Sequence, residues 1–418
     1  MDCTDKNLEL IADYIRSGEK KVQDAKLGIE AEHLVVDKET RKTIDHFDDN
    51  GNSKVLDMLM EFYPEPTYVD GKVMGLKRER SYITTEPAGQ IECSLVPMST
   101  LEEISNEYGT FLTQANKVLQ KSSQELVSIG YHPVSRIDEI KTIPKERYSY
   151  MYEHFSKTGN HGHNMMKGTC SLQVAIDYFD EEDFSRKLKV AGHLSALIFF
   201  LTSNVERFEG ETAPNMLRML IWEDTDPERC GIIPGSLSGS FGYRDYAKYV
   251  YDRKPITIIQ GNNTVGTGEK TLNEIYKTKE MSQEEIDWAL TMFFPDVRAK
   301  KYLELRSSDA MDFAESIALC ALMKGIFYTS FFERVYRFFS AFGEEDERKA
   351  RFELKEYGGS SKIYRVDASE LIKDLIDGAY EHLDQERELI LPMYQRLRDK
   401  SENSRTLFAQ VAAKRRLI

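Results

Sequence analysis

The chain has 418 residues, of which 41% are hydrophobic, and a net charge of −14 at pH 7. Hydrophobic cores stop growing beyond roughly 250–300 residues, so this length predicts one large domain with an appendage, or two domains. The acidic balance without a Lys/Arg stripe argues against a nucleic-acid-binding protein, and the most apolar run, Ala196 to Leu201, is shorter than the roughly 20 residues that cross a bilayer.

The five cysteines lie far apart and form no CxxC pair. This spacing indicates a reducing compartment rather than a disulfide framework or a zinc site. The N-terminal residues are polar and helical in pattern, without the basic and apolar regions of a signal peptide. From these features we expect a soluble, cytoplasmic protein that binds neither nucleic acid nor membrane and exists as a monomer or a homodimer.

Strand and helix patterns alternate through the first three quarters of the chain, and helical patterns follow. Helices are predicted at 5–17, 53–62, 100–121, 145–156, 182–203 and 283–290. Strands are predicted at 27–37, 77–85, 90–96, 125–130, 170–178, 218–223, 256–259 and 302–306. Later helices are predicted at 311–340, 368–380, 383–399 and 402–415. This order predicts an α+β fold with a helical C-terminal tail.

Four of the predicted strands have one apolar and one polar face, because alternate side chains of a strand point to opposite sides. The polar faces carry, strand by strand, Glu30 and Glu32, then Gln90, Glu92 and Ser94, then Ser171, Gln173 and Asp177, and finally Glu304 and Arg306. Paired in one sheet, these faces would form a single acidic surface, with Glu86 in the turn before the second strand. Neighbouring carboxylates repel unless cations lie between them, and Mg²⁺ prefers oxygen ligands that it shares with phosphates.

A solvated sheet face is the ordinary interpretation of any one alternating strand with outward glutamates. Four coincident cases, one with Arg306 beside Glu304, weaken that interpretation. The pattern alone leaves the function open.

Five ordered blocks of sequence resemble a known enzyme family. They are GIEAEH, TTEPAGQIECS, NMMKGTCSLQVAIDYFDEED, RMLIWEDTDPERCGIIP and FPDVRAKKYLELRSSDA, with PKERY at 144–148. Between about residues 25 and 320 the chain is similar to the plant-type and bacterial glutamate–cysteine ligases, which catalyse the first step of glutathione synthesis. The resemblance implies a glutamine-synthetase-like fold, in which a curved, largely antiparallel sheet forms an active-site funnel with helices on its outer face. The ligase core would then be residues 1–345, and 346–418 would be a helical extension packed on it, or part of one continuous domain.

The resemblance also implies roles for individual residues. The metal ligands would be Glu30, Glu32, Glu86, Glu92, Glu304 and Gln173. Glu304 and Arg306 would be the catalytic residues, and the Arg306 guanidinium would hold the α-carboxylate of glutamate through a two-point contact. Arg218 and Trp222 would lie near the substrates, and Arg298 would face the phosphates of ATP. Two or three Mg²⁺ ions would be the cofactor, with ATP as co-substrate.

The implied reaction joins the γ-carboxylate of glutamate to the amine of cysteine through γ-glutamyl phosphate, with release of ADP and phosphate. Two alternatives remain: a related ligase that joins glutamate to another amine, and an inactive nucleotide-binding regulator of the same fold. The chain departs from the family pattern at Ala88, at Ser307-Ser308 and at Lys167-Gly168, which affects the identity of the amine and the phosphate contacts.

Two further motifs are predicted to have no catalytic role. Glu269 interrupts the Gly-Lys pair that a phosphate loop requires, so residues 266–271 are predicted to form a turn. His161 and His163 have no Cys or His partners that would complete a metal site, and a solvated loop is predicted there.

Overall fold

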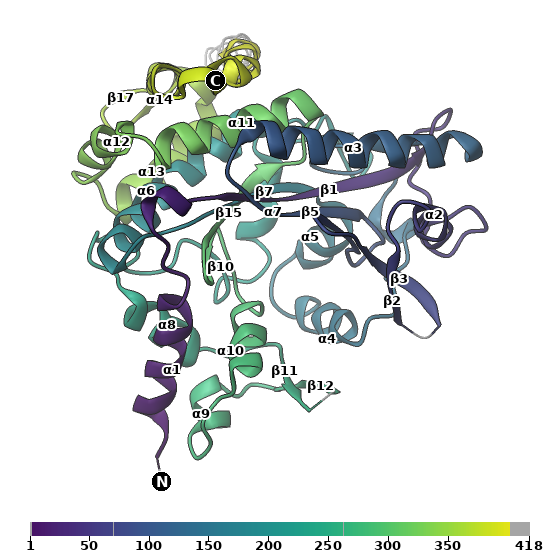
Figure 1. The fold of residues 1–418 in the computed structure, drawn as a ribbon, viewed down its shortest axis with the longest axis horizontal. Coiled ribbons are helices and arrows are strands. Elements are labelled where there is room, and N and C mark those ends of the chain that lie inside the picture. The colour runs from purple at the N-terminus through teal and green to yellow at the C-terminus, as the bar shows by residue number, and fades with distance from the viewer. Residues whose placement is uncertain (1, 70, 262, 402–418) are drawn as a thin grey trace, which may run out of the picture.

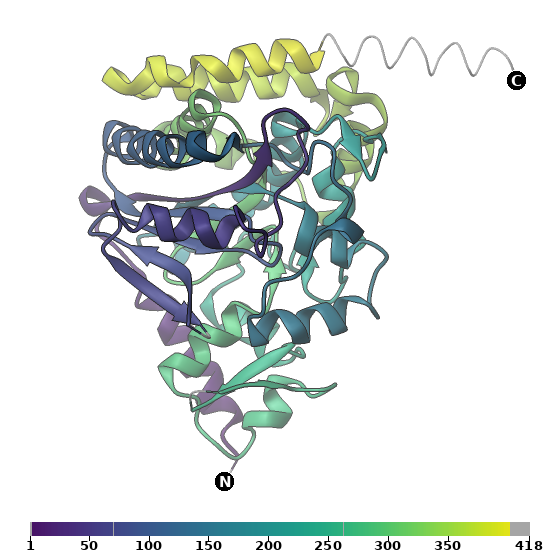
Figure 2. The same cartoon turned by 90° about the vertical axis from the view of Figure 1, so that its right-hand side faces the viewer.

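The computed structural model, which describes residues 2–69, 71–261 and 263–401, is built around one curved sheet (Figures 1 and 2). Within the described residues this sheet has nine strands, and all of their pairings are antiparallel. The strand order is β14 (Val297–Ala299), β15 (Leu303–Asp309), β7 (Ser171–Ile176), β1 (Leu27–Asp37), β5 (Ile91–Met98), β4 (Ser81–Thr85), β3 (Lys72–Lys77) and β2 (Glu65–Val69), with β6 (Gln124–Val127) also paired to β1.

The four strands with alternating polar faces, β15, β7, β1 and β5, are consecutive neighbours in this order. The prediction that they pair in one sheet is therefore confirmed, as is the α+β fold class. The remaining strands form two-stranded pairs: β8 (Arg207–Phe208) with β9 (Glu211–Thr212), β10 (Cys230–Gly231) with β13 (Phe294–Pro295), β11 (Thr257–Gln260) with β12 (Asn263–Gly266), and β16 (Lys362–Ile363) with β17 (Val366–Asp367).

Helices cover both faces of the sheet. They are α1 (Thr4–Arg16), α2 (Asn52–Leu59), α3 (Leu101–Leu119), α4 (Glu146–Phe155), α5 (Gly162–Gly168), α6 (Glu181–Thr202), α7 (Leu217–Glu223), α8 (Tyr243–Tyr251), α9 (Leu272–Tyr276), α10 (Gln283–Leu290), α11 (Phe313–Phe327), α12 (Phe331–Phe339), α13 (Glu344–Tyr357) and α14 (Ala368–His382). Short 3-10 turns are η1 (Val22–Asp24), η2 (Gln120–Ser122), η3 (Ile137–Glu139), η4 (Gly358–Ser360) and η5 (Asp384–Ile390). Figure 1 shows α3 and α11 above the sheet and α4, α5 and α10 below it.

The apolar faces of the central strands pack against the outer helices in one large buried cluster that extends from Leu8 to Leu397. The C-terminal helices contribute to this same cluster, and the boundary at residue 345 stays a prediction. Within the described residues, no single helix is long and apolar enough to cross a membrane. Only α11 and α12 together, bent by 82°, reach that length and composition.

Residues 218–223 were predicted to be a strand, and this is wrong: they lie in α7. A spacing of four residues puts Arg218 and Trp222 on one side of a strand and also on one side of a helix, so the pattern could not distinguish the two.

The predicted helix 311–340 is broken between α11 and α12. The hydroxyl of Thr329 donates to the carbonyl of Gly325 at 2.7 Å and accepts from the amide of Phe331 at 3.1 Å, which ends one helix and starts the next.

Other predicted boundaries also moved. The predicted strand 77–85 includes the end of β3 and all of β4, with a turn at 78–80 between them, and 383–399 begins as the 3-10 turn η5 before the helix at 391–401. The sequence patterns did not predict α5, α8 or α13. The predicted helix at 402–415 lies outside the described residues.

Candidate active site

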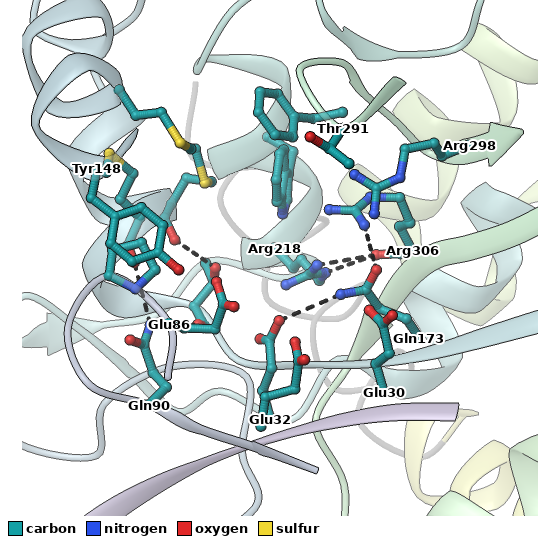
Figure 3. Close-up of a pocket in the computed structure, with 18 of the residues that line it drawn as sticks. Glu30, Glu32, Glu86, Gln90, Tyr148, Gln173, Arg218, Thr291, Arg298 and Arg306 are labelled. Atoms are coloured by element: carbon teal, nitrogen blue, oxygen red, sulfur yellow. Dashed lines mark hydrogen bonds between the residues drawn. The ribbon is translucent and has the colours of Figure 1, made fainter. Parts of the chain in front are cut away.

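The inner face of the sheet forms the floor of a cavity of about 260 Å³ (Figure 3). Nine predicted site residues line this cavity: Glu30, Glu32, Glu86, Glu92, Gln173, Arg218, Trp222, Arg298 and Arg306. The tenth, Glu304, lines an adjoining cavity of about 130 Å³ that also includes Glu30 and Gln173. Side chains from distant parts of the sequence thus meet in one place.

The register of the sheet places like charges against one another. Glu32 on β1 is directly opposite Glu92 on β5, and Glu30 is opposite Gln173 on β7. Like charges opposite each other on one face destabilise a sheet. Burial, reinforced by Glu86 and Glu32, raises the pKa of Glu92 to about 8.

The two glutamates of β1, Glu30 and Glu32, also have raised pKa values. Burial, followed by repulsion from Glu304 and Glu92, raises the pKa of Glu30 to about 8. Burial and Glu86 raise the pKa of Glu32 to about 7, although the amide of Ser171 donates to its carboxylate at 2.7 Å. The positive charges near these carboxyl groups are therefore too few to neutralise them.

Glu86 is held over the cavity by a tight turn. The amide of Gly89 donates to the carbonyl of Glu86 at 2.8 Å, and Gly89 has a φ of +81°. The Gln90 side chain closes the turn by accepting from the amide of Ala88 at 2.9 Å. Ala88 is not among the residues with positive φ, so this departure from the family pattern costs the backbone nothing.

Glu304 differs from the other acids because two guanidinium groups bind it. Arg298 donates to both of its oxygens, at 2.7 and 3.1 Å, and Arg306 donates at 2.9 Å. Burial opposes ionisation, but the two arginines outweigh it and lower the pKa of Glu304 to about 2. Arg306 also donates to the side-chain oxygen of Gln173.

Three buried donors in the cavity lining have no hydrogen-bond acceptor among the described residues. They are Nη1 of Arg218, Nε1 of Trp222 and Nε of Arg147. The rest of the Arg218 guanidinium donates to the carbonyl of Arg306, at 3.1 and 3.2 Å. Buried donors without acceptors are costly, and three of them at one cavity favour an anionic ligand.

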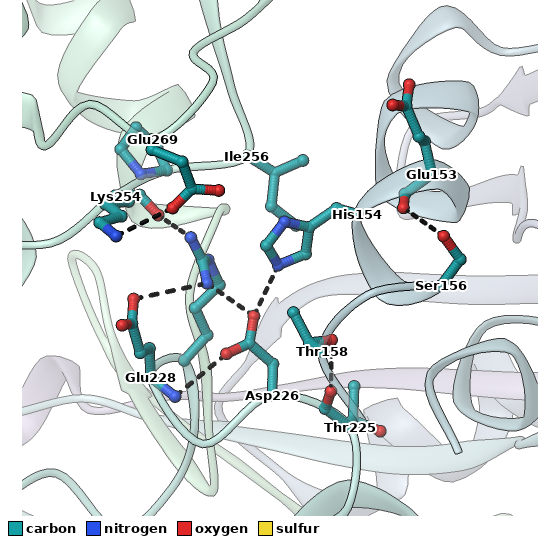
Figure 4. Close-up of polar contacts among 12 residues, drawn as sticks. Glu153, His154, Ser156, Thr158, Thr225, Asp226, Glu228, Lys254, Ile256 and Glu269 are labelled. Atoms are coloured by element: carbon teal, nitrogen blue, oxygen red, sulfur yellow. Dashed lines mark hydrogen bonds and ion pairs between the residues drawn. The ribbon is translucent and has the colours of Figure 1, made fainter. Parts of the chain in front are cut away.

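A buried polar cluster joins the two helices that carry these donors (Figure 4). His154, at the end of α4, lies 2.7 Å from the carboxylate of Asp226, which follows α7 and also pairs with Arg229 at 2.6 Å. This cluster therefore fixes the α4 wall, with Arg147, relative to the α7 wall, with Arg218.

Several lining residues were not assigned a role from the sequence. Arg147 lay in the PKERY block, and its side chain packs over the ring of Trp288. Lys300 lines the cavity, and its position two residues after Arg298 in a strand pattern could have identified it. Met151, Met165 and Met166 form a sulfur-containing wall that no charge pattern marks.

The donor set fits a hard divalent cation, although the side chains as placed form no ready ligand cage. Among the described residues, no group of three or more His, Cys, Asp or Glu side chains is positioned to hold a metal. However, Glu30, Glu32, Glu86 and Glu92 supply only carboxylate oxygens, the ligands that Mg²⁺ prefers. Burial and mutual repulsion raise the pKa values of Glu30, Glu32 and Glu92, and a cation between such carboxylates would favour their charged forms.

The two motifs predicted to be unrelated to catalysis lie outside the cavity lining. Within residues 266–271, Glu269 pairs with Lys254 at 2.9 Å and Thr271 caps α9. His161 contacts Asp224 at 2.6 Å, and His163 stacks on Tyr152 with ring centroids 3.8 Å apart. The prediction of a loop at His163 is wrong, because that residue lies in the first turn of the short helix α5.

Comparisons with known proteins agree with the fold. Residues 26–402 match the family model described as "Glutamate-cysteine ligase family 2". The chain is 30% identical over 332 residues to the chloroplastic glutamate–cysteine ligase of Brassica juncea, covering 77% of this chain and 63% of that protein. It is 31% identical over 331 residues to the chloroplastic glutamate–cysteine ligase A of Oryza sativa subsp. indica, covering 77% and 66%. The match thus spans less than two thirds of the length of these relatives.

A solved structure shares the fold. The glutamate–cysteine ligase of Francisella tularensis in complex with AMP has a TM-score of 0.52 and 11% sequence identity, covering 95% of this chain and 86% of that chain. At this identity the likeness shows the fold alone, which is the predicted glutamine-synthetase-like one.

The prediction of a cytoplasmic location is wrong on this comparison. The curated relatives are named as chloroplastic proteins. Composition and cysteine spacing could not distinguish two reducing compartments from each other.

Gly89→Ala is expected to destabilise the turn that carries Glu86, and Ala88→Gly is its matched control. An added Cβ at Gly89 would lie 3.0 Å from the Cβ of His46 at a φ of +81°, and the left-handed conformation alone costs about 1–2 kcal/mol. Denaturant unfolding should show this loss for Gly89→Ala and a smaller loss for Ala88→Gly. Equal losses would contradict the role of the turn.

Proposed function

We propose, from the premise that the chain belongs to glutamate–cysteine ligase family 2, that it joins the γ-carboxylate of glutamate to the amine of cysteine at the expense of ATP. The observation that carries the proposal is the cavity itself, in which half-buried carboxylates face buried donors that lack acceptors among the described residues. A retained fold without activity would need neither feature, and both cost stability.

The chemistry consists of two displacements. An oxygen of the glutamate γ-carboxylate attacks the γ-phosphorus of ATP, so that an O–P bond forms while the bond to the ADP oxygen breaks. The amine of cysteine then attacks the acyl carbon of γ-glutamyl phosphate, a C–N bond forms, and phosphate and a proton leave. Phosphoryl transfer depends on positioning and charge neutralisation rather than on a protein nucleophile.

Arg218, Trp222 and Arg306 line one part of the cavity, the arginine wall. This wall would bind the glutamate substrate. Arg306 would hold its α-carboxylate, and the unpaired Nη1 of Arg218 and Nε1 of Trp222 would complete the anionic contact. The guanidinium of Arg218 lies 5.5 Å from the ring of Trp222 and that of Arg306 lies 5.8 Å from it, so these three groups form one surface.

The nucleotide would approach from the adjoining cavity. Its walls include the ring of Tyr302, Leu95 and Pro97, which provide apolar contacts, and it meets the main cavity at Glu30. Arg298 and Lys300 line the main cavity, where Arg298 pairs with Glu304 of the adjoining cavity, and both would face the phosphates. Lys300 has a lowered pKa because of burial, which a phosphate contact would reverse.

Two or three Mg²⁺ ions would be held by Glu30, Glu32, Glu86, Glu92, Glu304 and Gln173. Bound there, they would neutralise phosphate oxygens and align the reacting groups. In the structure Glu304 is neutralised by Arg298 and Arg306, so metal binding by Glu304 would require these contacts to be exchanged. Small-molecule substrates and a monomeric or homodimeric state remain part of this proposal.

ADP release with a panel of amines tests the reaction. Purified protein with ATP, Mg²⁺ and glutamate should release ADP quickly only when cysteine is added, with formation of γ-glutamylcysteine by mass spectrometry. Serine and alanine serve as acceptors of similar size. Stimulation by another amine but not by cysteine would indicate the related ligase, and background turnover with every acceptor would indicate an inactive protein.

Arg306→Lys should raise the KM for glutamate at least tenfold with a smaller effect on the KM for ATP, because an ammonium group cannot make the two-point contact of a guanidinium. Initial rates at varied glutamate and saturating ATP measure this. Arg244→Lys, on the exposed surface, is the control. An unchanged KM for glutamate would remove Arg306 from the substrate contact.

The metal-free protein should become less stable as the pH rises from about 6 to about 9. Glu30 and Glu92 have pKa values of about 8 in the folded protein, against an ordinary value of 4.5. The folded state therefore binds more protons than the unfolded chain across this range, and the free energy of unfolding falls as these protons leave.

Thermal unfolding in EDTA and in Mg²⁺ tests this. The Tm in EDTA should fall by several degrees between the two pH values, and Mg²⁺ should raise it more at the higher pH, because its ligands must be deprotonated. Glu92→Gln should reduce both effects. A Tm in EDTA that does not vary with pH would show that the pKa values of these acids do not change on folding.

A further inference from the structure

Helix α13 lies outside the cavity lining but contacts the elements that form its arginine wall. At its C-terminal end, the side chain of Asn215 donates to the carbonyl of Leu354 at 3.1 Å, just before α7 begins. At its N-terminal end, the carboxylate of Glu344 accepts from the amide of Gly235 at 2.5 Å. Between these two anchors lies a buried ionic cluster.

Arg351 is the centre of that cluster. Its guanidinium pairs with Glu347 at 2.5 Å within α13, with Glu223 at 3.3 Å and with Asp296. Arg351, Glu347 and Asp296 are all at most 6% exposed. One buried cation thus serves three carboxylates from three parts of the chain. The buried charges of Glu347 and Asp296 depend on it, whereas the Glu223 side chain is 43% exposed.

Two of these partners lie beside cavity residues. Glu223 is the last residue of α7 and follows Trp222 directly. Asp296 lies between β13 and β14, two residues before Arg298, and its carbonyl accepts from the amide of Arg306 at 2.9 Å. Arg351 therefore connects the glutamate side of the cavity, on α7, with the phosphate side, on β14.

We propose that Arg351 is a positioning residue for catalysis. It holds α7 and β14 at a fixed distance and orientation, so that Trp222, Arg218 and Arg298 all face the cavity. This inference rests on the proposed function for its kinetic test and on geometry alone for its spectroscopic test. It makes the α13 segment a necessary part of the active site rather than an appendage.

The test compares Arg351→Gln with Leu354→Ala. Leu354 is fully buried on the same helix, and its truncation removes packing without touching the ionic cluster. At temperatures where both variants are folded, Arg351→Gln should lower kcat/KM by roughly 10- to 100-fold, as expected for misplaced binding groups. Leu354→Ala should lower the Tm with little change in kcat/KM, and Arg351→Lys should be intermediate.

The partner variants separate the two sides of the cavity. Glu223→Gln should raise the KM for glutamate more than that for ATP, because it loosens α7. Asp296→Asn should raise the KM for ATP more, because it loosens β14. If Arg351→Gln does not fold, these two variants decide the question, and wild-type KM values in both would overturn the proposal.

Tryptophan fluorescence gives a readout that needs no activity. The chain has two tryptophans, so in a Trp288→Phe background the emission comes from Trp222 alone. Acrylamide should quench it more in Arg351→Gln than in Leu354→Ala. If the wild type proves inactive, the proposed function fails while this quenching still tests Arg351. Equal quenching and, in an active enzyme, equal kcat/KM in the two variants would overturn the inference.

Discussion

The constraint on which this structure depends is the crowding of half-buried like charges on one sheet face. Glu32 and Glu92 face each other across two paired strands. Glu30 lies on the same face, two residues before Glu32 on β1. A fold maintained for stability alone would replace these acids with neutral residues, because burial of each unpaired carboxylate costs free energy. The large apolar cluster behind the sheet provides the stability that allows this arrangement to persist.

The charges are not distributed evenly over the cavity, and this difference suits the reaction. Glu304 is neutralised by two arginines and ionises readily, whereas Glu30 and Glu92 lack such partners and hold their protons more tightly. One part of the site is therefore balanced within the protein, and added cations would balance the other. The proposed reaction between a carboxylate and a triphosphate would use both: fixed cations for the acid, and metal ions that come with the nucleotide.

Much of this site could be predicted from the sequence because a strand has a period of two. In β1, β5, β7 and β15 the apolar residues alternate with Glu, Gln and Arg, and once these strands pair, all of the polar side chains must share one face. Motif resemblance then assigned Glu86, which lies in a turn where no period applies. The turn needs a positive φ at Gly89, where the chain has a glycine. Ala88 has no positive φ, so the alanine causes no backbone strain.

The rest could not be predicted, because it depends on contacts between elements that are distant in sequence. Arg218 and Trp222 fit a strand and a helix equally well, and only packing on β15 and α5 decides for α7. Arg351 is preceded by charged residues at 344–349, a composition typical of a solvated helix, yet it is buried against Asp296 and Glu223. Its function follows from position: a single guanidinium that binds acids from two cavity walls transmits any shift of one wall to the other. Sequence spacing contains no trace of such a connection, since Asp296 and Glu223 are 55 and 128 positions from Arg351.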